Sequence, residues 1–386
     1  MAVVIALDSF KGSLSAAKAS RALAQGIEEV VPEEEVIVLP IADGGDGLID
    51  CLNESFLAQG WKLQSLWVTG PYSKKVKASY LLKEKNAFIE MARSSGLTLV
   101  GNDQKRPLLS TTYGLGEVIT DAVNRGATTL YIGLGGSATN DLGLGCMQAL
   151  GVDLWTEDHQ LIAQPFKSGD LLKLKEISTE KFESKFCNVK VVAVCDVSNV
   201  LLGEKGATEV FGPQKGLRSE EIWQIESAMI QAAALLKEYF GKDYSETHGA
   251  GAAGGMGAAL MWFFDAKVEN GIDTVLDLLQ FENALKKAQF VITGEGSFDE
   301  QSLSGKAPLG VLKMAKAHGQ SISLVAGRIR VSEKTFRDLG FDSFFSIRDI
   351  AASDEESFLN AKELLIELGR LWAQKHLKAQ KIINLK

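Results

Sequence analysis

The chain has 386 residues, of which 46% are hydrophobic and 23% charged, so it can bury the cores of two or three globular domains. Its net charge of −8, without a dense run of Lys or Arg, excludes the electrostatic footprint of a nucleic-acid or anionic-membrane binder. No apolar run approaches the roughly 20 residues of a membrane-spanning helix. The four cysteines form no CxxC pair, which disfavours a zinc site or a disulfide framework and favours a reducing, cytoplasmic setting.

The start of the chain predicts a parallel α/β unit. Residues 2–8 ("AVVIALD") form a continuous apolar run, typical of a strand that is covered on both faces. A helix over 13–30, a second strand over 35–41 and a helix over 47–60 follow, and this order implies a right-handed parallel crossover. The loops after the two strands therefore open at the same edge of the sheet, where ligands bind in such folds.

The middle of the chain has a different pattern. Three short alternating segments, 62–68, 76–82 and 86–92, predict antiparallel strands. The elements predicted after them are a helix over 111–125, a strand over 128–134, a glycine-rich stretch over 133–145, a strand over 189–197 and a helix over 219–240.

After about residue 287 the parallel pattern returns. Buried strands over 290–294, 321–327 and 343–347 alternate with helices that begin near Pro308 and Ser332. A last helix is expected to begin at a capping-box pattern and to point four leucines inward: Ser353 and Glu356 make the box, and the leucines are Leu359, Leu364, Leu365 and Leu368.

These elements predict an α/β fold with two domains. The first is a discontinuous, Rossmann-like parallel-sheet domain built from both chain ends, residues 1–65 and 289–386. The second is an inserted mixed α/β domain of residues 66–288. The cleft between the two domains is the expected ligand site.

Six glycine-bearing polar loops accompany these elements: 8–13, 43–47, 133–145, 196–216, 249–257 and 294–306. Glycine costs about 0.5–1 kcal/mol in regular structure, so such clusters indicate positive φ or a ligand close to the backbone. In the stretch "GLGGSATNDLGLG", the N–H groups of Gly135, Gly136 and Ser137 can form an anion-binding nest. The alternative is a tight strand-to-helix turn. The stretch is not a dinucleotide fingerprint, because Ala138 stands where the last glycine is required, and the chain contains no GxxxxGK[ST].

Charged residues in these loops fit a phosphate ligand with a metal ion. Lys11, Lys215 and Lys306 can each hold a phosphate or a carboxylate, with a solvated surface lysine as the alternative. Mg²⁺ takes one or two carboxylates together with phosphate oxygens, and a further Asp commonly orients a phosphoryl acceptor. The loops offer carboxylates for both roles, each with an Asx-turn or a helix cap as its alternative: Asp8, Asp43, Asp46, Asp141, Asp196, Glu295 and Asp299. The acceptor is left open by this pattern.

Eight segments run in order from residue 5 to about 327: "ALDSFKGSLSA", "ADGGDG", "TTYGLGE", "GLGGSATND", "CDVSN", "GATEVFGPQKG", "GAGAAGGMG" and "TGEGSFDEQSLSGKAPLGV". Together they resemble the glycerate kinase type-1 family. Two positions depart from the family pattern, because Asp46 stands where Glu is expected and Leu48 where Thr is expected. The resemblance implies ATP-dependent phosphorylation of D-glycerate to 2-phosphoglycerate, with 3-phosphoglycerate as the alternative product. A hydroxy-acid dehydrogenase and a non-catalytic metabolite-binding protein are the rival interpretations.

The resemblance, together with the positioning and charge neutralisation that phosphoryl transfer requires, implies roles for the loop residues. Gly135, Gly136 and Ser137 would cradle the phosphates of ATP, with Lys215 and Lys306 as further phosphate contacts. Lys11 would act in catalysis by bridging the transferring phosphoryl group and the glycerate carboxylate.

The carboxylates divide between the acceptor and the metal. Asp196, or Asp299 in its place, would orient the attacking hydroxyl. The residues expected at the acceptor are Asp8, Ser9, Asp43, Gly44 and Gly45, and those expected at Mg²⁺ are Asp46, Asp141 and Glu295. Whether the chain forms a homo-oligomer is left open by the sequence.

Overall fold

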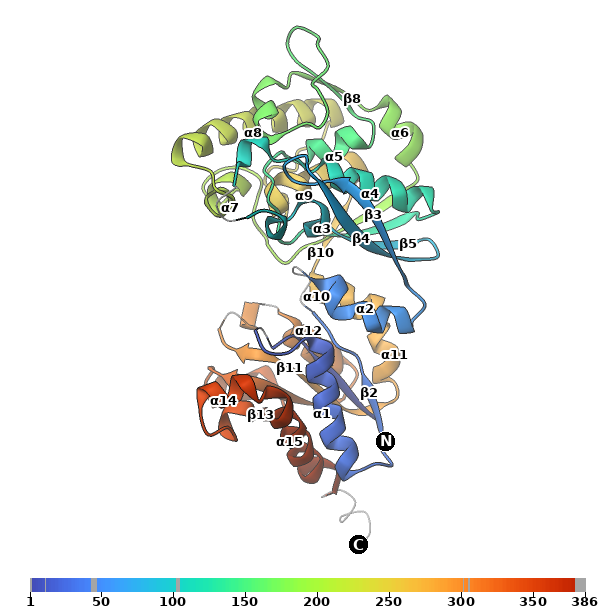
Figure 1. Cartoon of the computed structure of the whole chain (residues 1–386), viewed down its shortest axis with the longest axis vertical. Helices are drawn as coiled ribbons and strands as arrows, with labels where there is room; N and C mark the ends of the chain where they lie inside the picture. Colours follow the sequence, from blue (N-terminus) through green and yellow to red (C-terminus); the bar gives the residue numbers. More distant parts are fainter. Residues whose placement is uncertain are drawn as a thin grey trace. The chain divides into compact units, whose positions relative to one another are not determined.

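The computed structural model describes residues 2–10, 12–42, 47–101, 105–300, 302–304 and 306–378. The chain forms two compact units (Figure 1), and the α/β class predicted from the sequence is confirmed. The first unit comprises Met1–Asp43, Asp50–Gln59 and Ile272–Lys386, and the second comprises Gly44–Ile49 and Gly60–Gly271.

The first unit is built on a five-stranded, fully parallel sheet with the strand order β13-β12-β11-β1-β2. β1 lies between β11 and β2, and its six apolar residues are all buried, as expected for a strand that is covered on both faces. The strands are β1 (Ala2–Leu7), β2 (Glu35–Val38), β11 (Ala288–Phe298), β12 (Ser321–Ile329) and β13 (Ser343–Ser346).

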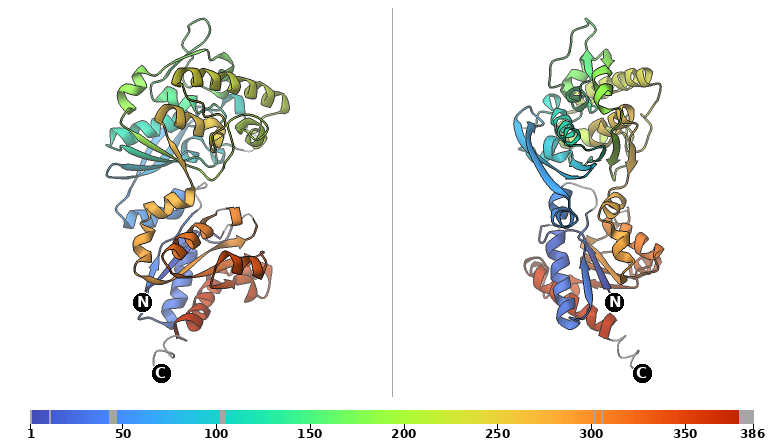
Figure 2. Two further views of the ribbon diagram at one scale, coloured as in Figure 1. Left: turned by 180° about the vertical axis from the view of Figure 1, so that it is seen from behind. Right: turned by 90° about the vertical axis from the view of Figure 1, so that its right-hand side faces the viewer.

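Helices cover both faces of this sheet (Figure 2). On one face α1 (Ala16–Val30) packs along α15 (Ala361–Ala373), and the two helices approach through glycines. A Cβ on Gly26 would lie 1.9 Å from the Ile366 carbonyl oxygen, and one on Gly369 would lie 2.3 Å from that of Leu23. Only glycine therefore permits this crossing. The remaining helices of the unit are α2 (Leu48–Ala58, which spans the unit boundary), α10 (Gly271–Leu278), α11 (Phe281–Leu285), α12 (Ala307–Ala317), α13 (Glu333–Leu339) and α14 (Asp354–Leu359).

The segment 272–288 corrects the predicted boundary. The sequence interpretation assigned it to the inserted domain, but the structure packs it with the first unit. The amide of Gln59 donates to the Leu279 carbonyl at 2.8 Å, and the amide of Gln320 donates to that of Leu285 at 3.0 Å. Burial of apolar side chains such as Phe281 drives this packing, and a local sequence pattern does not reveal which of two cores will bury them.

The end of the chain also differs from prediction. The expected single last helix is divided at Asn360 into α14 and α15. The Ser353 hydroxyl accepts the Glu356 N–H at 3.0 Å, so the predicted N-terminal cap is present. Leu365 and Leu368 are buried as predicted, whereas Leu359 is 76% exposed because the break turns α14 away from the core.

The second unit is built on a six-stranded mixed sheet with the order β10-β9-β6-β5-β4-β3. The three strands predicted to be antiparallel are β3 (Lys62–Thr69), β4 (Lys75–Lys83) and β5 (Asn86–Glu90), and their pairing is confirmed. The other three pair in parallel: β6 (Thr129–Gly133), β9 (Lys190–Val194) and β10 (Lys267–Glu269). A two-stranded antiparallel sheet joins β7 (Asp153–Trp155) to β8 (Glu176–Ser178).

Helices of the second unit bury one continuous apolar cluster with this sheet. The long helix predicted over 219–240 is present as α8 (Ser219–Phe240), and it ends at Gly241 with φ +67°, a left-handed cap that favours glycine. The others are α3 (Ala92–Ser95), α4 (Tyr113–Asn124), α5 (Leu144–Ala149), α6 (Glu180–Phe186), α7 (Ala207–Lys215) and α9 (Ala252–Phe264).

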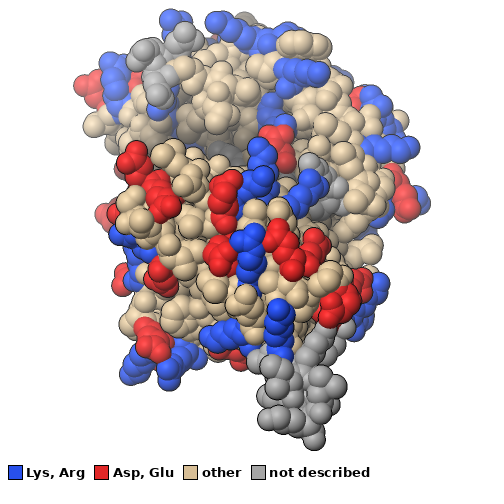
Figure 3. All heavy atoms as spheres, turned by 60° about the horizontal axis from the view of Figure 1, so that its bottom comes forward, with Lys and Arg blue, Asp and Glu red and all other residues tan. Residues whose placement is uncertain are grey.

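The surface matches the charge pattern of the sequence. On the face shown in Figure 3, Lys and Arg side chains are interspersed with Asp and Glu, and neither sign gathers into a broad patch on the described residues. None of the described helices combines the length and the apolar character needed to cross a bilayer.

Candidate functional site

A cavity of about 520 Å³ lies within the first unit, where the chain leaves the carboxyl ends of the parallel strands. This edge is the usual ligand side of a doubly wound sheet. Five residues selected from the sequence line it together: Asp8, Ser9, Glu295, Asp299 and Lys306. They come from two stretches of the chain, 8–9 and 295–306, which the parallel pairing of β1 with β11 brings together.

Two long strands supply the floor of the cavity. β11 runs on to Phe298, four residues past the predicted end at Gly294, and it stays paired with β12 to the end. Ser297 is the register partner of Arg328. Because side chains alternate along a strand, Glu295 and Ser297 face the same side as Arg328 and Arg330, and all four line the cavity.

Hydrogen bonds within the loops fix the acidic residues. The Asp8 N–H donates to the Gly294 carbonyl at 2.8 Å, and the Asp8 carboxylate accepts the N–H of Ser9. Asp8 is only 8% exposed and Glu295 only 9%, so both carboxylates are largely withdrawn from water. The Asp299 N–H donates to the Ser302 hydroxyl at 3.1 Å, which holds the turn after β11.

Lys306 is the N-cap residue of α12, and Pro308 lies in the first turn of that helix. The eleven-residue helix directs its N–H groups toward this end, where a negative charge is stabilised by the helix dipole. Lys306 thus brings a cation to a place that already favours an anion.

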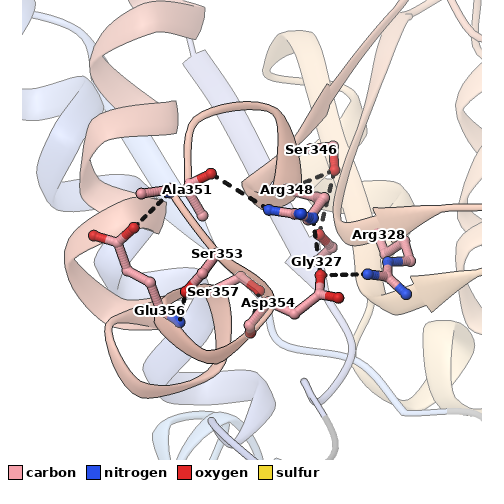
Figure 4. A network of polar contacts seen from close by, with 10 residues as sticks. Gly327, Arg328, Ser346, Arg348, Ala351, Ser353, Asp354, Glu356 and Ser357 are labelled. Atoms are coloured by element: carbon pink, nitrogen blue, oxygen red, sulfur yellow. Dashed lines mark hydrogen bonds and ion pairs between the residues drawn. The ribbon is translucent and has the colours of Figure 1, made fainter.

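Three arginines at the cavity were not selected from the sequence: Arg328, Arg330 and Arg348. Arg328 and Arg348 both bind the Asp354 carboxylate (Figure 4), Arg348 through Nε at 2.8 Å. The Arg328 hydrogen bond, with Arg348 and Arg330 nearby, lowers the pKa of Asp354. The alternating "GRIR" at the end of a buried strand was the available signal, because residues two apart on a strand share a face.

The second unit holds the glycine stretch 133–145. It follows β6, and an isolated antiparallel bridge between Gly96 and Ser137 pins it. The Leu97 N–H donates to the Gly136 carbonyl at 2.8 Å, and the Ala138 N–H donates to the Ser95 carbonyl at 2.8 Å. Gly136 has φ +62°, as a nest requires at one of its residues. Within the described residues, no acceptor is bound to the N–H of Gly135, Gly136 or Ser137.

The helix after this stretch begins later than expected. α5 starts at Leu144 and has six residues, so its N-terminus does not reinforce the nest at Gly135–Ser137. Gly143 and Gly145 are packing glycines, since a Cβ would lie 2.7 Å from that of Ala259 and 2.6 Å from the Thr111 hydroxyl, respectively.

Asp141 lies within this stretch and is fully buried. Its Oδ2 accepts from the Thr112 N–H and hydroxyl, both at 2.8 Å, and from the Gly145 N–H at 3.3 Å, while its Oδ1 accepts the Gly143 N–H at 3.2 Å. Burial raises the pKa of Asp141, and these hydrogen bonds lower it by a smaller amount. The two bonds from Thr112 tie the stretch to the start of α4, and the other two hold the stretch itself. Together they support a positioning role for Asp141 rather than a place among metal ligands.

Lys215 lies at the end of α7 and is 2% exposed. Its Nζ donates to the Thr139 carbonyl at 2.7 Å, and burial lowers its pKa to about 7, with an opposing contribution from Asp141. Two turns earlier on the same helix, the Thr208 hydroxyl accepts from the Asn140 amide at 3.1 Å. The surface-lysine alternative is therefore wrong for Lys215. Its buried amino group is hydrogen-bonded to the backbone of the glycine stretch at Thr139.

The other selected residues fall elsewhere. Asp196 is exposed at the end of β9 in the second unit, and its Oδ1 accepts the N–H of Gly271 at 2.7 Å. Lys11, Asp43, Gly44, Gly45 and Asp46 lie outside the described residues. Within the described part of the chain, no three His, Cys, Asp or Glu side chains cluster as a ready-made metal site.

Comparisons with known proteins agree on one family. A sequence model described as the glycerate kinase family matches residues 3–375. A glycerate kinase from Halalkalibacterium halodurans is 39% identical over 370 residues, 95% of this chain and 96% of the relative. A glycerate 2-kinase from Escherichia coli K12 is 38% identical over 372 residues, 96% of each chain. A crystal structure from Salmonella typhimurium LT2, provisionally named glycerate kinase 2, aligns with a TM-score of 0.87 and 37% identity over 99% of both chains.

Proposed function

The chain belongs to the glycerate kinase family and is a kinase, and from this premise we propose that it transfers a phosphoryl group from ATP to D-glycerate, giving 2-phosphoglycerate. The observation that carries the proposal is the cavity of the first unit, where carboxylates, a helix-capping lysine and arginines face one space. The name of the Escherichia coli relative supports the 2-position of the product over the 3-position. Family membership speaks against the dehydrogenase and the non-catalytic binding protein.

The glycine stretch of the second unit is the proposed cradle for the phosphates of ATP. The N–H groups of Gly135, Gly136 and Ser137 offer donors along a backbone that carries no bulky side chain. Lys215 holds this stretch in place through the hydrogen bond from its buried amino group to the carbonyl of Thr139. Fixed donors of this kind stabilise developing charge without having to reorganise during the reaction.

Magnesium fits the chemistry of the first-unit cavity. Mg²⁺ prefers carboxylate, phosphate and water oxygens and needs only one or two protein carboxylates, so a three-residue cluster is not required. Glu295 and Asp8 are nearly buried carboxylates at the cavity and are the residues we propose to hold it. When bound, Mg²⁺ neutralises charge on phosphate oxygens. Lys306, at the N-terminus of α12, is proposed to bind a phosphate group at this cavity.

Asp299 is the residue that we propose to orient the attacking hydroxyl, because it lines the same cavity as Asp8, Glu295 and Lys306. The contact of Asp196 with the Gly271 N–H supports a structural role at the end of β9. Comparing the variants Asp299→Asn and Asp196→Asn separates these roles. Loss of kcat in the first alone supports Asp299, and loss in the second alone returns the role to Asp196.

The test of the proposed function is the release of ADP by the full chain. ADP formation should require D-glycerate, ATP and Mg²⁺ together, and glycerol, which lacks the carboxylate, should not replace D-glycerate. Absence of D-glycerate-dependent ADP release would refute the proposed function.

A further inference from the structure

Arg328 and Arg348 enclose a carboxylate that belongs to the protein itself. Both guanidinium groups bind a single oxygen, Oδ1, of Asp354 (Figure 4). Arg348 also contacts the Ala351 carbonyl at 3.5 Å, and Asp354 is the acceptor that the described residues offer to Arg328. Each guanidinium carries five N–H donors in a planar fork that matches a carboxylate. Because both arginines contact only this one oxygen of Asp354, most of their N–H donors remain available to a ligand in the cavity that they line.

Asp354 comes from α14, a short helix that buries little side-chain surface. None of the residues of α14 is buried, and the side chains of Phe358 and Leu359 are 56% and 76% exposed. Two contacts join Phe358 to the loop after β1: its carbonyl accepts the Ser13 hydroxyl at 2.9 Å, and its ring would lie 3.2 Å from a Cβ on Gly12. A six-residue helix without buried residues can move at low cost, since little apolar surface is exposed when it leaves.

We propose that Arg328 and Arg348 bind the carboxylate group of the acid substrate, and that Asp354 occupies this subsite until the substrate displaces it. The identity of the acid, D-glycerate, rests on the proposed function. The charge of the surrounding groups fits this assignment, because Arg330 adds a third cation while Glu355, the next carboxylate on α14, is exposed. Departure of Asp354 leaves the arginines with a net positive charge that an incoming carboxylate neutralises.

The ion pairs of Asp354 with the two arginines are weak, so Asp354 can reduce the affinity for the substrate only slightly. The Asp354 carboxylate is 66% exposed, and Arg328 and Arg348 are 38% and 40% exposed. Exposed ion pairs are weak, so removing the competitor should tighten substrate binding by at most about fivefold. Removing one of the arginines deletes a charge-assisted contact with the ligand and should weaken binding by about 10- to 100-fold.

The test measures KM for D-glycerate, KM for ATP and kcat in four single variants and one double variant of the full chain. Arg328→Gln and Arg348→Gln should each raise KM for D-glycerate by about 10-fold or more and change KM for ATP by less than about twofold. Asp354→Ala should lower KM for D-glycerate by up to about fivefold. Glu355→Ala removes the same charge from the same helix and should leave all three constants unchanged. In the Arg328→Gln background, Asp354→Ala should lower KM less than it does in the wild-type chain, because only Arg348 then still pairs with Asp354.

Three results would overturn the proposal. A higher KM for D-glycerate in Asp354→Ala would mean that Asp354 orients the arginines instead of competing with the substrate. An effect of the arginine variants on ATP alone would assign the subsite to a nucleotide phosphate. Unchanged constants in both arginine variants would remove the subsite altogether. Melting curves of all variants check that each remains folded.

Failure of the proposed function would be seen separately. If the wild-type chain forms no phosphoglycerate, the proposed reaction is wrong, and titration calorimetry with D-glycerate then decides the subsite. Binding to the wild type that is lost in Arg328→Gln supports it. Equal binding to both proteins, or binding to neither, contradicts it.

Discussion

Lys215 should make the stability of the chain depend on pH in an unusual direction. Burial lowers its pKa from 10.5 to about 7, so between these values the folded chain has released a proton that the unfolded chain still holds. The free energy of unfolding must then rise with pH in this window, because the unfolded state binds more protons. Below about pH 7 both states are protonated and the dependence ends.

The size of the effect follows from the same linkage. In the variant Lys215→Met no proton is exchanged at this position, so the difference in unfolding free energy, wild type minus variant, should grow by about 1.4 kcal/mol for each pH unit between pH 7.5 and pH 9.5. Urea denaturation of both proteins at several pH values measures this slope. Taking the difference cancels the titration of other groups that the two proteins share.

Lys205→Met is the matched control, since Lys205 is an exposed lysine of the same unit and should give a flat difference. Parallel pH profiles for the wild type and Lys215→Met would refute the reasoning. They would show that Lys215 keeps an ordinary pKa and is not enclosed beneath the glycine stretch.

Two further predictions concern the same glycine stretch. Gly254→Ala places a Cβ 2.2 Å from the Thr139 carbonyl oxygen at φ +72°. It should lower the free energy of unfolding by more than the about 1–2 kcal/mol of left-handed strain alone, and it should raise KM for ATP. Gly241→Ala, at φ +67° with open space around it, should show the strain without the change in KM. Asp141→Asn turns an amide group toward backbone N–H donors that the carboxylate now satisfies. It should therefore lower the free energy of unfolding, measured by urea titration, by about 1–3 kcal/mol. An unchanged value would show that this network does not hold the stretch.

Sequence reasoning reached those features that local signals determine. Both ends of the helix Ser219–Phe240, including its glycine cap, were predicted from the sequence. The apolar run of β1 alone predicted a buried strand. Asp8, Glu295 and Lys306 were each selected from polar loops in the sequence, and the structure brings them together because β1 and β11 end at one edge of the sheet.

The features that were missed depend on tertiary structure. Arg328 reaches the cavity because β12 continues to Ile329, for which the alternating "GRIR" was a signal. Arg348 reaches it because the turn after β13 brings it beside Arg328, which no local pattern encodes. Lysine is rarely buried, so the enclosure of Lys215 could not be expected from its sequence neighbours. The packing of 272–288 with the first unit is a choice between two apolar cores, and composition does not distinguish them.

The position of the phosphate in the product tests the central claim most directly. The wild-type chain is incubated with Mg²⁺, ATP and D-glycerate, and the product is examined by phosphorus NMR with proton coupling. A phosphate on C2 couples to the single proton there and gives a doublet, whereas a phosphate on C3 couples to two protons and gives a triplet. We predict the doublet of 2-phosphoglycerate. A triplet, or no organic phosphate other than the nucleotides, would contradict the account.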